Sequence, residues 1–309
     1  MINISAKTLS LRSATAKARV HLSTGTIDLI RQGRIPKGNP LEIAKVAAVM
    51  AAKNTSQIIP YCHPIPVEGV DVSFELSENH IDLSVSVVSV YKTGVEVEAM
   101  TAASVCALTL YDMLKMVDDS LSIGSISLVE KKGGKSDFQD PIAPSLSAAV
   151  VVCSDSVHKG TKQDRTGKLI QEKLLSLGFN PPLYTVIPDD EKTIESVLLN
   201  LCDQKHVRLV LTTGGTGFSP RDVTPEATLK IIEREAPGIS EMLRAYGQER
   251  TPYSMLSRGV AGIRGQTIVV NLPGSTGGVK DALSSLFPAV LHAFAILAYQ
   301  PHDDKETAG

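Results

Sequence analysis

The sequence predicts two folded domains of different class, an α+β domain followed by an α/β domain. The chain has 309 residues, more than one hydrophobic core usually organises, so a single large domain is the less favoured alternative. In the first half, a hairpin pattern lies between helical segments, which favours an antiparallel sheet with helices. In the second half, strand and helix patterns take turns, which favours a mostly parallel sheet between helices.

A polar stretch with glycines and prolines separates the two halves. It runs KKGGKSDFQDPIAPS from Lys131 to Ser145, a composition typical of a linker. We place an N-terminal domain over residues 1–138, a linker over 139–146 and a C-terminal domain over 147–309. No internal repeat relates the two halves, so we expect two unrelated domains joined in one chain.

The composition is that of a globular protein with small ligands. Apolar residues make up 43% and charged residues 21%, as in chains that bury a core. The net charge of -2 gives no overall attraction to nucleic acid or anionic lipid. An aromatic content of 4% without tryptophan disfavours stacking on single-stranded nucleic acid. Small phosphorylated substrates are therefore expected, and neither nucleic acid nor a membrane is an expected partner.

The ends of the chain indicate a cytoplasmic protein. The residues after Met1, INISAKTLSLRSATAKARV, lack the apolar segment of a secretory signal. The longest apolar run, Phe287 to Tyr299, is shorter than the roughly 20 residues that a membrane span needs. We expect this run to form a buried helix.

The cysteines indicate neither disulfides nor a zinc site. No CxxC spacing occurs among them, so reduced and mostly buried thiols are expected at Cys62, Cys106, Cys153 and Cys202. Cys62 and His63 are adjacent, but no second Cys/His pair follows at zinc-finger spacing. We therefore expect no structural zinc.

The N-terminal half contains three clear patterns of secondary structure. Asn39-Pro40 before LEIAKVAAVMAAK supplies a helix cap, a proline at the first helical position and apolar residues at helical spacing. VDVSFEL and IDLSVSVVSV alternate around Ser-Glu-Asn, as the strands of an antiparallel hairpin do. A long helix is expected from about Glu98 to Val117.

Many ionisable residues of this half stand among apolar ones. On the predicted helix, Glu98 and Asp112 lie on similar faces but about 21 Å apart, so they cannot both touch one reacting atom. If both serve active sites, a second subunit completes each site, and we expect a homo-oligomer, a trimer or a hexamer. Asp112 and Lys115 are three residues apart and can form an acid-base pair. Considered alone, His63 beside prolines fits a core or turn position better than a catalytic one, and the lysines fit a solvated surface.

In the C-terminal half, four predicted strands each run into a polar loop. AAVVVCS, LYTVIP, VRLVLTT and QTIVVNL end at the loops 154–156, 189–190, 214–217 and 273–275. The carboxyl ends of parallel strands meet at one edge of a sheet, where such folds bind ligands. We therefore expect the four loops, including Asp155 in the first, to lie together.

The glycine loop TTGGTG is compatible with phosphate binding. Glycines let backbone N–H groups approach a phosphate closely, although a tight turn that merely closes a strand has the same composition. The pattern matches neither GxGxxG nor the lysine-bearing P-loop. Downstream, Asp222 precedes a helix that we expect near Pro225 with Thr224 as its cap. Asp189 and Asp190 follow a neighbouring strand, so a carboxylate from that loop and Asp222 can converge on the Mg²⁺ of a nucleoside triphosphate, with capping or turn roles as the alternative.

The C-terminal motifs together resemble a known family. TTGGTG, RDVTPEAT, IPDD and SRGVAGIRGQTIVVNLPGS are similar to molybdopterin adenylyltransferases, which are related to the gephyrin G domain, over about residues 147 to 300. The resemblance implies AMP transfer from Mg-ATP to the terminal phosphate of molybdopterin, with Mg²⁺ at Asp189 and Asp222. It also implies phosphate or pterin contacts, for which the candidates are Asp155, Gly214, Gly215, Thr216, Gly217 and Ser275. Ser-Asp-Ser in the first loop and Thr-Gly-Gly after NLPGS depart from the common family pattern and leave a basic contact unaccounted for.

The N-terminal motifs resemble cyclic pyranopterin monophosphate synthase. IPYCHP, KTGVEVEAMTAASVCALTLYDMLK and KKGGKS are similar to that family over about residues 1 to 136. The resemblance implies conversion of 3',8-cyclo-7,8-dihydroguanosine triphosphate into cyclic pyranopterin monophosphate and pyrophosphate, without a redox cofactor. The matching positions are Lys37, His63, Glu96, Glu98, Asp112, Lys115 and Lys131, with Arg12 as a candidate anion contact. We expect lysines near other cations to have lowered pKa values and to act as general acids or bases, while the carboxylates and His63 orient substrate or shuttle protons.

The two resemblances support a bifunctional biosynthetic enzyme. Sulfur insertion lies between the two reactions, so direct transfer of product between the domains is not implied. A C-terminal domain that only binds molybdopterin or acts as a scaffold is the alternative. A regulatory nucleotide-binding protein is disfavoured by the density of acid-base residues in the N-terminal half.

Overall fold

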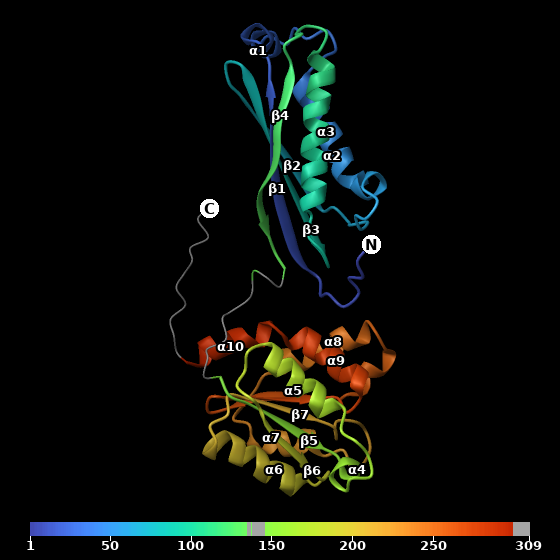
Figure 1. The fold of residues 1–309 in the computed structure, drawn as a ribbon, viewed down its shortest axis with the longest axis vertical. Helices are drawn as coiled ribbons and strands as arrows, with labels where there is room; N and C mark the ends of the chain where they lie inside the picture. Colours follow the sequence, from blue (N-terminus) through green and yellow to red (C-terminus); the bar gives the residue numbers. More distant parts are fainter. Residues whose placement is uncertain (135–136, 138–145, 299–309) are drawn as a thin grey trace. The chain divides into compact units, whose positions relative to one another are not determined.

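The computed structural model describes residues 1–134, 137 and 146–298, and it divides into two compact units. The first unit is Met1–Asp137 and the second is Phe138–Gly309, each drawn with its own sheet in Figure 1. The predicted linker, residues 139–146, lies outside the described residues except for Leu146.

The first unit is built on a four-stranded antiparallel sheet with the order β2-β3-β1-β4. The predicted hairpin is confirmed as β2 (Gly69–Leu76) and β3 (His80–Tyr91), which pair from Gly69↔Val88 to Leu76↔Ile81. Two strands were not predicted, β1 (Ser10–His21) and β4 (Ser122–Lys132). In β1 the buried positions are mostly alanines that alternate with Lys17 and Arg19, so its apolar signal is weak.

Among the described residues of this unit, the α-helices are α1 (Thr24–Arg31), α2 (Pro40–Ile58) and α3 (Glu96–Leu114). The predicted start of α2 is confirmed, because the Asn39 side chain accepts the N–H groups of Leu41 and Glu42. The long helix α3 begins two residues before and ends three residues before the predicted bounds. Glu96 therefore lies in its first turn, and Lys115 immediately follows its last residue.

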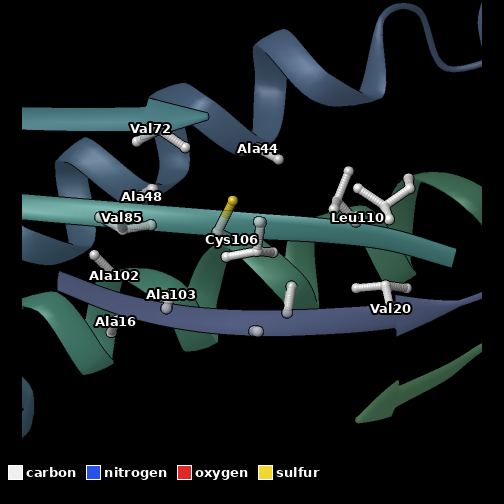
Figure 2. Packing of buried hydrophobic residues seen from close by; sticks show 14 of the residues in the cluster. Ala16, Val20, Ala44, Ala48, Val72, Val85, Ala102, Ala103, Cys106 and Leu110 are labelled. Carbon is white, nitrogen blue, oxygen red and sulfur yellow. The ribbon is translucent and has the colours of Figure 1, made fainter. Parts of the chain in front are cut away.

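The core of this unit lies between α2, α3 and one face of the sheet (Figure 1). Small residues on both helices, among them Ala48, Ala103 and Cys106, let the helices approach the strand valines closely (Figure 2). By length and composition α3 is apolar enough to cross a membrane, and α9 and α10 of the second unit pass the same test as a pair bent by 57°. Because α3 packs against the sheet and α2, its hydropathy is that of a core helix.

The second unit has a six-stranded sheet with the order β6-β5-β7-β10-β9-β8. The four predicted strands are confirmed as mutually parallel, β5 (Ala148–Cys153), β6 (Leu183–Ile187), β7 (Leu209–Thr213) and β10 (Thr267–Leu272). Two short strands at one edge, β8 (Arg234–Glu235) and β9 (Ala261–Arg264), were not predicted and run antiparallel to their neighbours. The fold is thus α/β with a mostly parallel sheet, as expected.

Helices cover both faces of this sheet (Figure 1). On one face lie α5 (Thr166–Ser176), α8 (Pro237–Gln248), α9 (Thr276–Leu286) and α10 (Ala289–Leu297). On the other lie α6 (Glu191–Leu199), continued by a π-helical turn η2 (Asn200–Gln204), and α7 (Thr224–Ile231). Two elements of this unit are short. The helix α4 (Asp155–His158) follows β5, and the 3-10 turn η3 (Pro252–Leu256) follows α8.

Two local predictions in this unit are wrong in detail. Thr224 is the first residue of α7 and gives it no side-chain cap, because the helix starts one residue earlier than expected. The apolar run from Phe287 is not one buried helix: α10 begins at Ala289, after a cis peptide bond to Pro288, and Ile296 on it is 53% exposed. Tyr299, the expected end of that run, lies outside the described residues.

Candidate functional sites

The first cluster of candidate residues is the lysine–aspartate cluster, Lys37, Asp112 and Lys115. Lys37 stands in the turn before α2 and donates to both the backbone carbonyl (2.7 Å) and Oδ2 (2.9 Å) of Asp112. Lys115 Nζ lies 2.8 Å from Asp112 Oδ1, so the predicted acid-base pair forms. Lys115 and Lys37 lower the pKa of Asp112 to about 2. One carboxylate therefore holds two ammonium groups at the end of α3.

The expected lowering of lysine pKa values is wrong for Lys115. Its hydrogen bond to Asp112 raises the pKa of the ammonium group, because a nearby opposite charge favours the protonated form. Lys115 is thus a fixed cation in this state and suits binding of an anion better than removal of a proton. A change in protonation of Lys115 would first require loss of the contact with Asp112.

The second cluster is the glutamate cluster, Cys62, Glu96, Glu98 and Lys131, at the start of α3. Lys131 Nζ on β4 lies 3.5 Å from Glu96 Oε1. Glu98 is only 2% exposed, and its Oε1 accepts a hydrogen bond from the Cys62 thiol at 3.1 Å. Glu98 Oε2 is buried without a hydrogen-bond partner among the described residues. Burial raises the pKa of Glu98, as expected for a carboxyl group taken out of water.

Two further candidates lie near this end of the unit. His63 follows Cys62 and its Nε2 lies 2.8 Å from the carbonyl oxygen of Ile2. Arg12 on β1 donates from Nε to the carbonyl oxygen of Tyr91 at 3.4 Å. A Cβ at Gly134 would stand 2.1 Å from Arg12 Nη1, so the glycines after Lys132 let the chain pass close to the guanidinium group.

The structure therefore divides the eight N-terminal candidates between two ends of α3. Glu98 and Asp112 occupy the first and last turns of this helix, as the 14-residue spacing requires. A cavity of about 850 Å³ lies elsewhere in this unit, between strand residues such as Lys17, Arg19 and Ser84. No predicted site residue lines this cavity among the described residues.

In the second unit, the loops after the four parallel strands surround one polar pocket of about 710 Å³. Ser154, Asp189, Gly215 and Ser275 each come from a different loop and all line it. The loops pack backbone against backbone, since a Cβ at Gly214 (φ +100) would stand 2.2 Å from the carbonyl oxygen of Cys153. Glycine is therefore required where the loops after β5 and β7 meet.

In this polar pocket, only one of the two carboxylate oxygens of Asp189 has a hydrogen-bond partner among the described residues. Its Oδ2 accepts the backbone N–H of Asp155 at 3.0 Å, whereas its Oδ1 is buried without a partner among the described residues. Burial, and then the negative charge of Asp222, raise the pKa of Asp189. Asp222 Oδ2 accepts the N–H of Ser219 at 2.9 Å. The two carboxylates thus lie near enough to repel each other, which a bound cation would relieve.

The remaining predicted residues have structural partners. The Asp155 side chain forms an ion pair with Arg221. Thr216 is buried, and the Ser275 hydroxyl accepts the N–H of Gly278 at 3.1 Å as the cap of α9. Asp155, Thr216 and Gly217 do not line the polar pocket.

Sequence reasoning missed the basic side chains of the polar pocket. Lys162 and Arg165, from the segment between α4 and α5, both line it, so cations are present although the first loop has Ser-Asp-Ser. They stand six and nine residues beyond Ser156, the last residue of the loop in which a basic residue was expected. The nearby sequence TKQDRTG was the available signal.

Arg258 was missed as well, although it belongs to the motif SRGVAGIRG. Its backbone N–H donates to the carbonyl oxygen of Thr216 at 2.8 Å, and its Nε donates to that of Gly217 at 2.7 Å. Its Nη2 donates to the carbonyl oxygen of Asp222, and Glu226 balances its charge. Arg258 thus ties both ends of the segment 216–222 to one side chain.

A second pocket adjoins the polar one. This apolar pocket, of about 370 Å³, is lined by residues of α8, η3 and α9 together with Asn271 and Ser275. Ser275 also lines the polar pocket. Two cavities of different character therefore meet at the loop after β10.

Comparison with known proteins assigns each unit separately and the chain as a whole. Residues 1–134 match the MoaC family, and residues 149–292 match the family described as probable molybdopterin binding domain. Over 302 residues the chain is 39% identical to the molybdenum cofactor biosynthesis bifunctional protein of Chlorobaculum tepidum, covering 98% of this chain and 96% of that protein.

The chain belongs to the family of bifunctional molybdenum cofactor biosynthesis proteins.

Each half of this bifunctional protein also matches separate proteins. The N-terminal half is 47% identical over 137 residues to the cyclic pyranopterin monophosphate synthase of Desulfitobacterium hafniense, which covers 44% of this chain and 84% of that protein. The C-terminal half is similar to the molybdopterin biosynthesis enzyme MoaB of Thermus thermophilus, with 40% identity, a TM-score of 0.48, and coverage of 50% of this chain and 98% of that chain. The matches of residues 1–134 and 149–292 to the two families confirm the resemblance stated from the motifs for both halves.

Proposed function

We propose that this bifunctional protein catalyses two reactions of molybdenum cofactor biosynthesis. The N-terminal unit would convert 3',8-cyclo-7,8-dihydroguanosine triphosphate into cyclic pyranopterin monophosphate and pyrophosphate. The C-terminal unit would transfer AMP from Mg-ATP to the terminal phosphate of molybdopterin and release pyrophosphate. The observation that carries the first proposal is the lysine–aspartate cluster, and the one that carries the second is the unpartnered Oδ1 of Asp189 in a pocket lined by glycines and cations.

In the N-terminal reaction, the lysine–aspartate cluster supplies fixed positive charge. Lys37 and Lys115 are held by Asp112 and can stabilise the negative charge that develops when pyrophosphate leaves. The buried carboxyl group of Glu98 has a raised pKa and can hold or release a proton during the ring rearrangement. Arg12 and Lys131 add cations at the second cluster, and His63 adds an imidazole that can donate or accept a hydrogen bond.

We further propose that the working site combines the two clusters from different subunits. Within one chain they stand about 21 Å apart along α3, too far to act on one substrate. A homo-oligomer, a trimer or a hexamer, can bring the lysine–aspartate cluster of one subunit to the glutamate cluster of another.

Subunit complementation tests this arrangement. Asp112→Asn and Glu98→Gln chains would each lose at least about 100-fold in activity alone, and mixing after mild dissociation would restore pyrophosphate release from the cyclic triphosphate. With random mixing of equal amounts, up to about a quarter of all shared sites pair two intact clusters. Mixed oligomers that form, as shown by two differently tagged chains purifying together, yet stay inactive would refute it.

In the C-terminal reaction, Asp189 and Asp222 would hold the Mg²⁺ that accompanies ATP. No group of three or more His, Cys, Asp or Glu side chains able to hold a metal ion occurs among the described residues. Mg²⁺ usually takes one or two carboxylates and completes its shell with phosphate oxygens and water, so two aspartates fit this ion. Bound to the nucleotide, Mg²⁺ would neutralise charge on the phosphates during transfer.

The two pockets that meet at Ser275 suit a reaction with two substrates. The polar pocket offers glycine N–H groups, Lys162 and Arg165 to phosphates. The apolar pocket offers a surface for a flat pterin ring. The bond that breaks, between the α- and β-phosphates of ATP, would then lie near the loops after β7 and β10.

The alternative is a C-terminal unit that binds molybdopterin without turnover. The family description as a molybdopterin binding domain favours it. Asp189→Asn separates the two: as an enzyme, the wild-type protein forms adenylylated molybdopterin with Mg-ATP and the variant loses at least about 100-fold in rate. A wild-type protein that binds molybdopterin but forms no adenylylated product with Mg-ATP would be a binding module.

A further inference from the structure

The contact between Cys62 and Glu98 is the feature of the N-terminal unit that the proposed reaction does not yet use. Cys62 stands four residues after the end of α2, and Glu98 lies in the first turn of α3. Cys62 Sγ donates to Glu98 Oε1 at 3.1 Å, and more weakly approaches the carbonyl oxygen of His63 at 3.7 Å. A residue 36 positions away in sequence thus satisfies one oxygen of a carboxyl group that is 2% exposed.

The two oxygens of Glu98 are in different situations. Oε1 accepts the thiol hydrogen, whereas Oε2 is buried and has no hydrogen-bond partner among the described residues. A buried polar atom without a partner costs free energy and is seldom kept in a protein without a use. When Glu98 takes up a proton, Oε1 remains the acceptor of the thiol, so the proton resides on Oε2.

We propose that Cys62 is a positioning residue which, by donating to Oε1, makes Oε2 the oxygen of Glu98 that takes up and releases the proton. This inference deepens the proposed N-terminal reaction and rests on it for its role in catalysis. Cys62 itself neither forms a covalent bond nor gives up its proton.

The state of the thiol fits this role. Burial and the hydrogen bond to Glu98 raise the pKa of Cys62 to about 12, so the sulfur keeps its hydrogen at neutral pH and remains a donor. A thiolate, which is the nucleophilic form, would not be present. The protonated thiol is thus a poor nucleophile and suits the role of a hydrogen-bond donor.

The groups around Glu98 determine in which direction its pKa changes when the Cys62 thiol is removed. Burial is the main cause of its raised pKa and the charge of Glu96 adds to it, whereas the hydrogen bond from Cys62, and then one from the backbone of Glu98 itself, act in the opposite direction. Lys131 on β4 is paired with Glu96. Loss of the thiol donor therefore raises the pKa of Glu98 further, and loss of the Lys131 charge would reach Glu98 only through Glu96.

The test is an infrared pH titration of the full-length protein. The carbonyl-stretch band of protonated Glu98 is assigned as the band that Glu98→Gln lacks, and its midpoint is followed in Cys62→Ala and Cys62→Ser. We expect Cys62→Ala to raise the midpoint by about half a pH unit or more, because a thiol is a weak but real donor. Cys62→Ser keeps a donor and should give a smaller rise.

Cys106→Ala is the matched control. Cys106 lies on the same helix, is fully buried, and has a pKa raised by burial alone. Its removal takes the same atom out of the same unit without touching the carboxyl group, so the Glu98 midpoint should stay unchanged. A rise of equal size in Cys106→Ala would mean that loosened packing moves the midpoint, and would overturn the inference.

Rates of pyrophosphate release over the same pH range connect the contact with the reaction. We expect the limb of the wild-type pH profile that follows Glu98 to shift upward with the infrared midpoint in Cys62→Ala. An unchanged midpoint in Cys62→Ala, equal midpoints for the alanine and serine variants, or no Glu98 band above the pH of acid unfolding would each overturn the inference. If the wild type releases no pyrophosphate while the midpoints shift as expected, the proposed reaction fails and the positioning contact stands.

Discussion

Removal of the Arg258 side chain tests how the proposed nucleotide site of the C-terminal unit is held together. Arg258→Met keeps the apolar stem and removes the guanidinium group that donates to the carbonyl oxygens of Gly217 and Asp222. The segment 216–222 would then keep the contact from the backbone N–H of residue 258 to Thr216. We expect the loop to become mobile and Asp222 to lose its fixed position relative to Asp189.

The structure gives the size of this effect. Hydrogen bonds that involve a charged group contribute about 1.5–3 kcal/mol each. Since the Arg258 side chain is 34% exposed, the lower value applies, and two bonds sum to about 3 kcal/mol. The partly exposed pair with Glu226 adds less than about 1 kcal/mol. If binding must order the loop again, about 3 kcal/mol corresponds to a roughly hundredfold weaker affinity for Mg-ATP.

Isothermal titration calorimetry with Mg-ATP measures the affinity, and hydrogen–deuterium exchange measures the mobility of residues 214–222. Arg264→Met is the matched control, because Arg264 also pairs with a carboxylate, Asp203, and donates to a carbonyl oxygen, that of Ile231. Arg264 lines neither pocket among the described residues, so its loss should leave the affinity within about twofold. An Arg258→Met protein that binds Mg-ATP as tightly as the control would refute the reasoning, whereas a wild type that binds no Mg-ATP would refute the proposed reaction instead.

Three further predictions follow from individual contacts. Burial alone would raise the pKa of Asp118, but hydrogen bonds from Ser120 and Ser23 outweigh it and hold this pKa below its usual value. The ionised Asp118 side chain therefore stabilises the folded state fully above about pH 4, and this contribution is lost as the pH falls further. Asp118→Asn should lower the free energy of unfolding in urea by about 1–2 kcal/mol at pH 7. The difference between the variant and the wild type should become smaller toward pH 2, and a difference that does not change with pH would contradict this. Asp112→Asn should reduce pyrophosphate release by at least about 100-fold. Because Lys115 and Lys37 lower the pKa of Asp112 to about 2, the shape of the pH profile above pH 4 should not change. A limb of the profile that disappears with this variant would show that Asp112 titrates in the assay range. Gly214→Ala would place a Cβ 2.2 Å from the carbonyl oxygen of Cys153. It should lower the free energy of unfolding by about 2 kcal/mol or more and abolish Mg-ATP binding. Gly277→Ala in α9 places a Cβ that meets no atom within 4 Å, and it should raise the free energy of unfolding by up to about 1 kcal/mol. Equal unfolding midpoints for these two alanine variants would contradict the close packing of the loops.

Local patterns in the sequence determined much of the architecture. The start of α2 follows from Asn39 and Pro40, whose cap and first-turn preferences act within four residues. The β2–β3 hairpin and the four parallel strands follow from alternation and from apolar runs that end at polar loops. Motifs such as TTGGTG and KTGVEVEAM also indicated the family, because a family signature is itself carried by short stretches of sequence.

The tertiary structure alone decided which side chains meet. β1 escaped prediction because its buried face is largely alanine, which contributes little apolar signal, and it became a central strand only through pairing with β3 and β4. The contacts Lys37–Asp112, Cys62–Glu98 and Arg258–Gly217 span 75, 36 and 41 positions. Burial, hydrogen bonding and pKa depend on distance in space, and no local pattern encodes which of many polar residues the folded chain will bring within 3 Å of each other. For that reason the sequence identified Glu98 and Asp222 as candidates, while the fold showed that Cys62 donates to Glu98 and Arg258 to the backbone of Asp222.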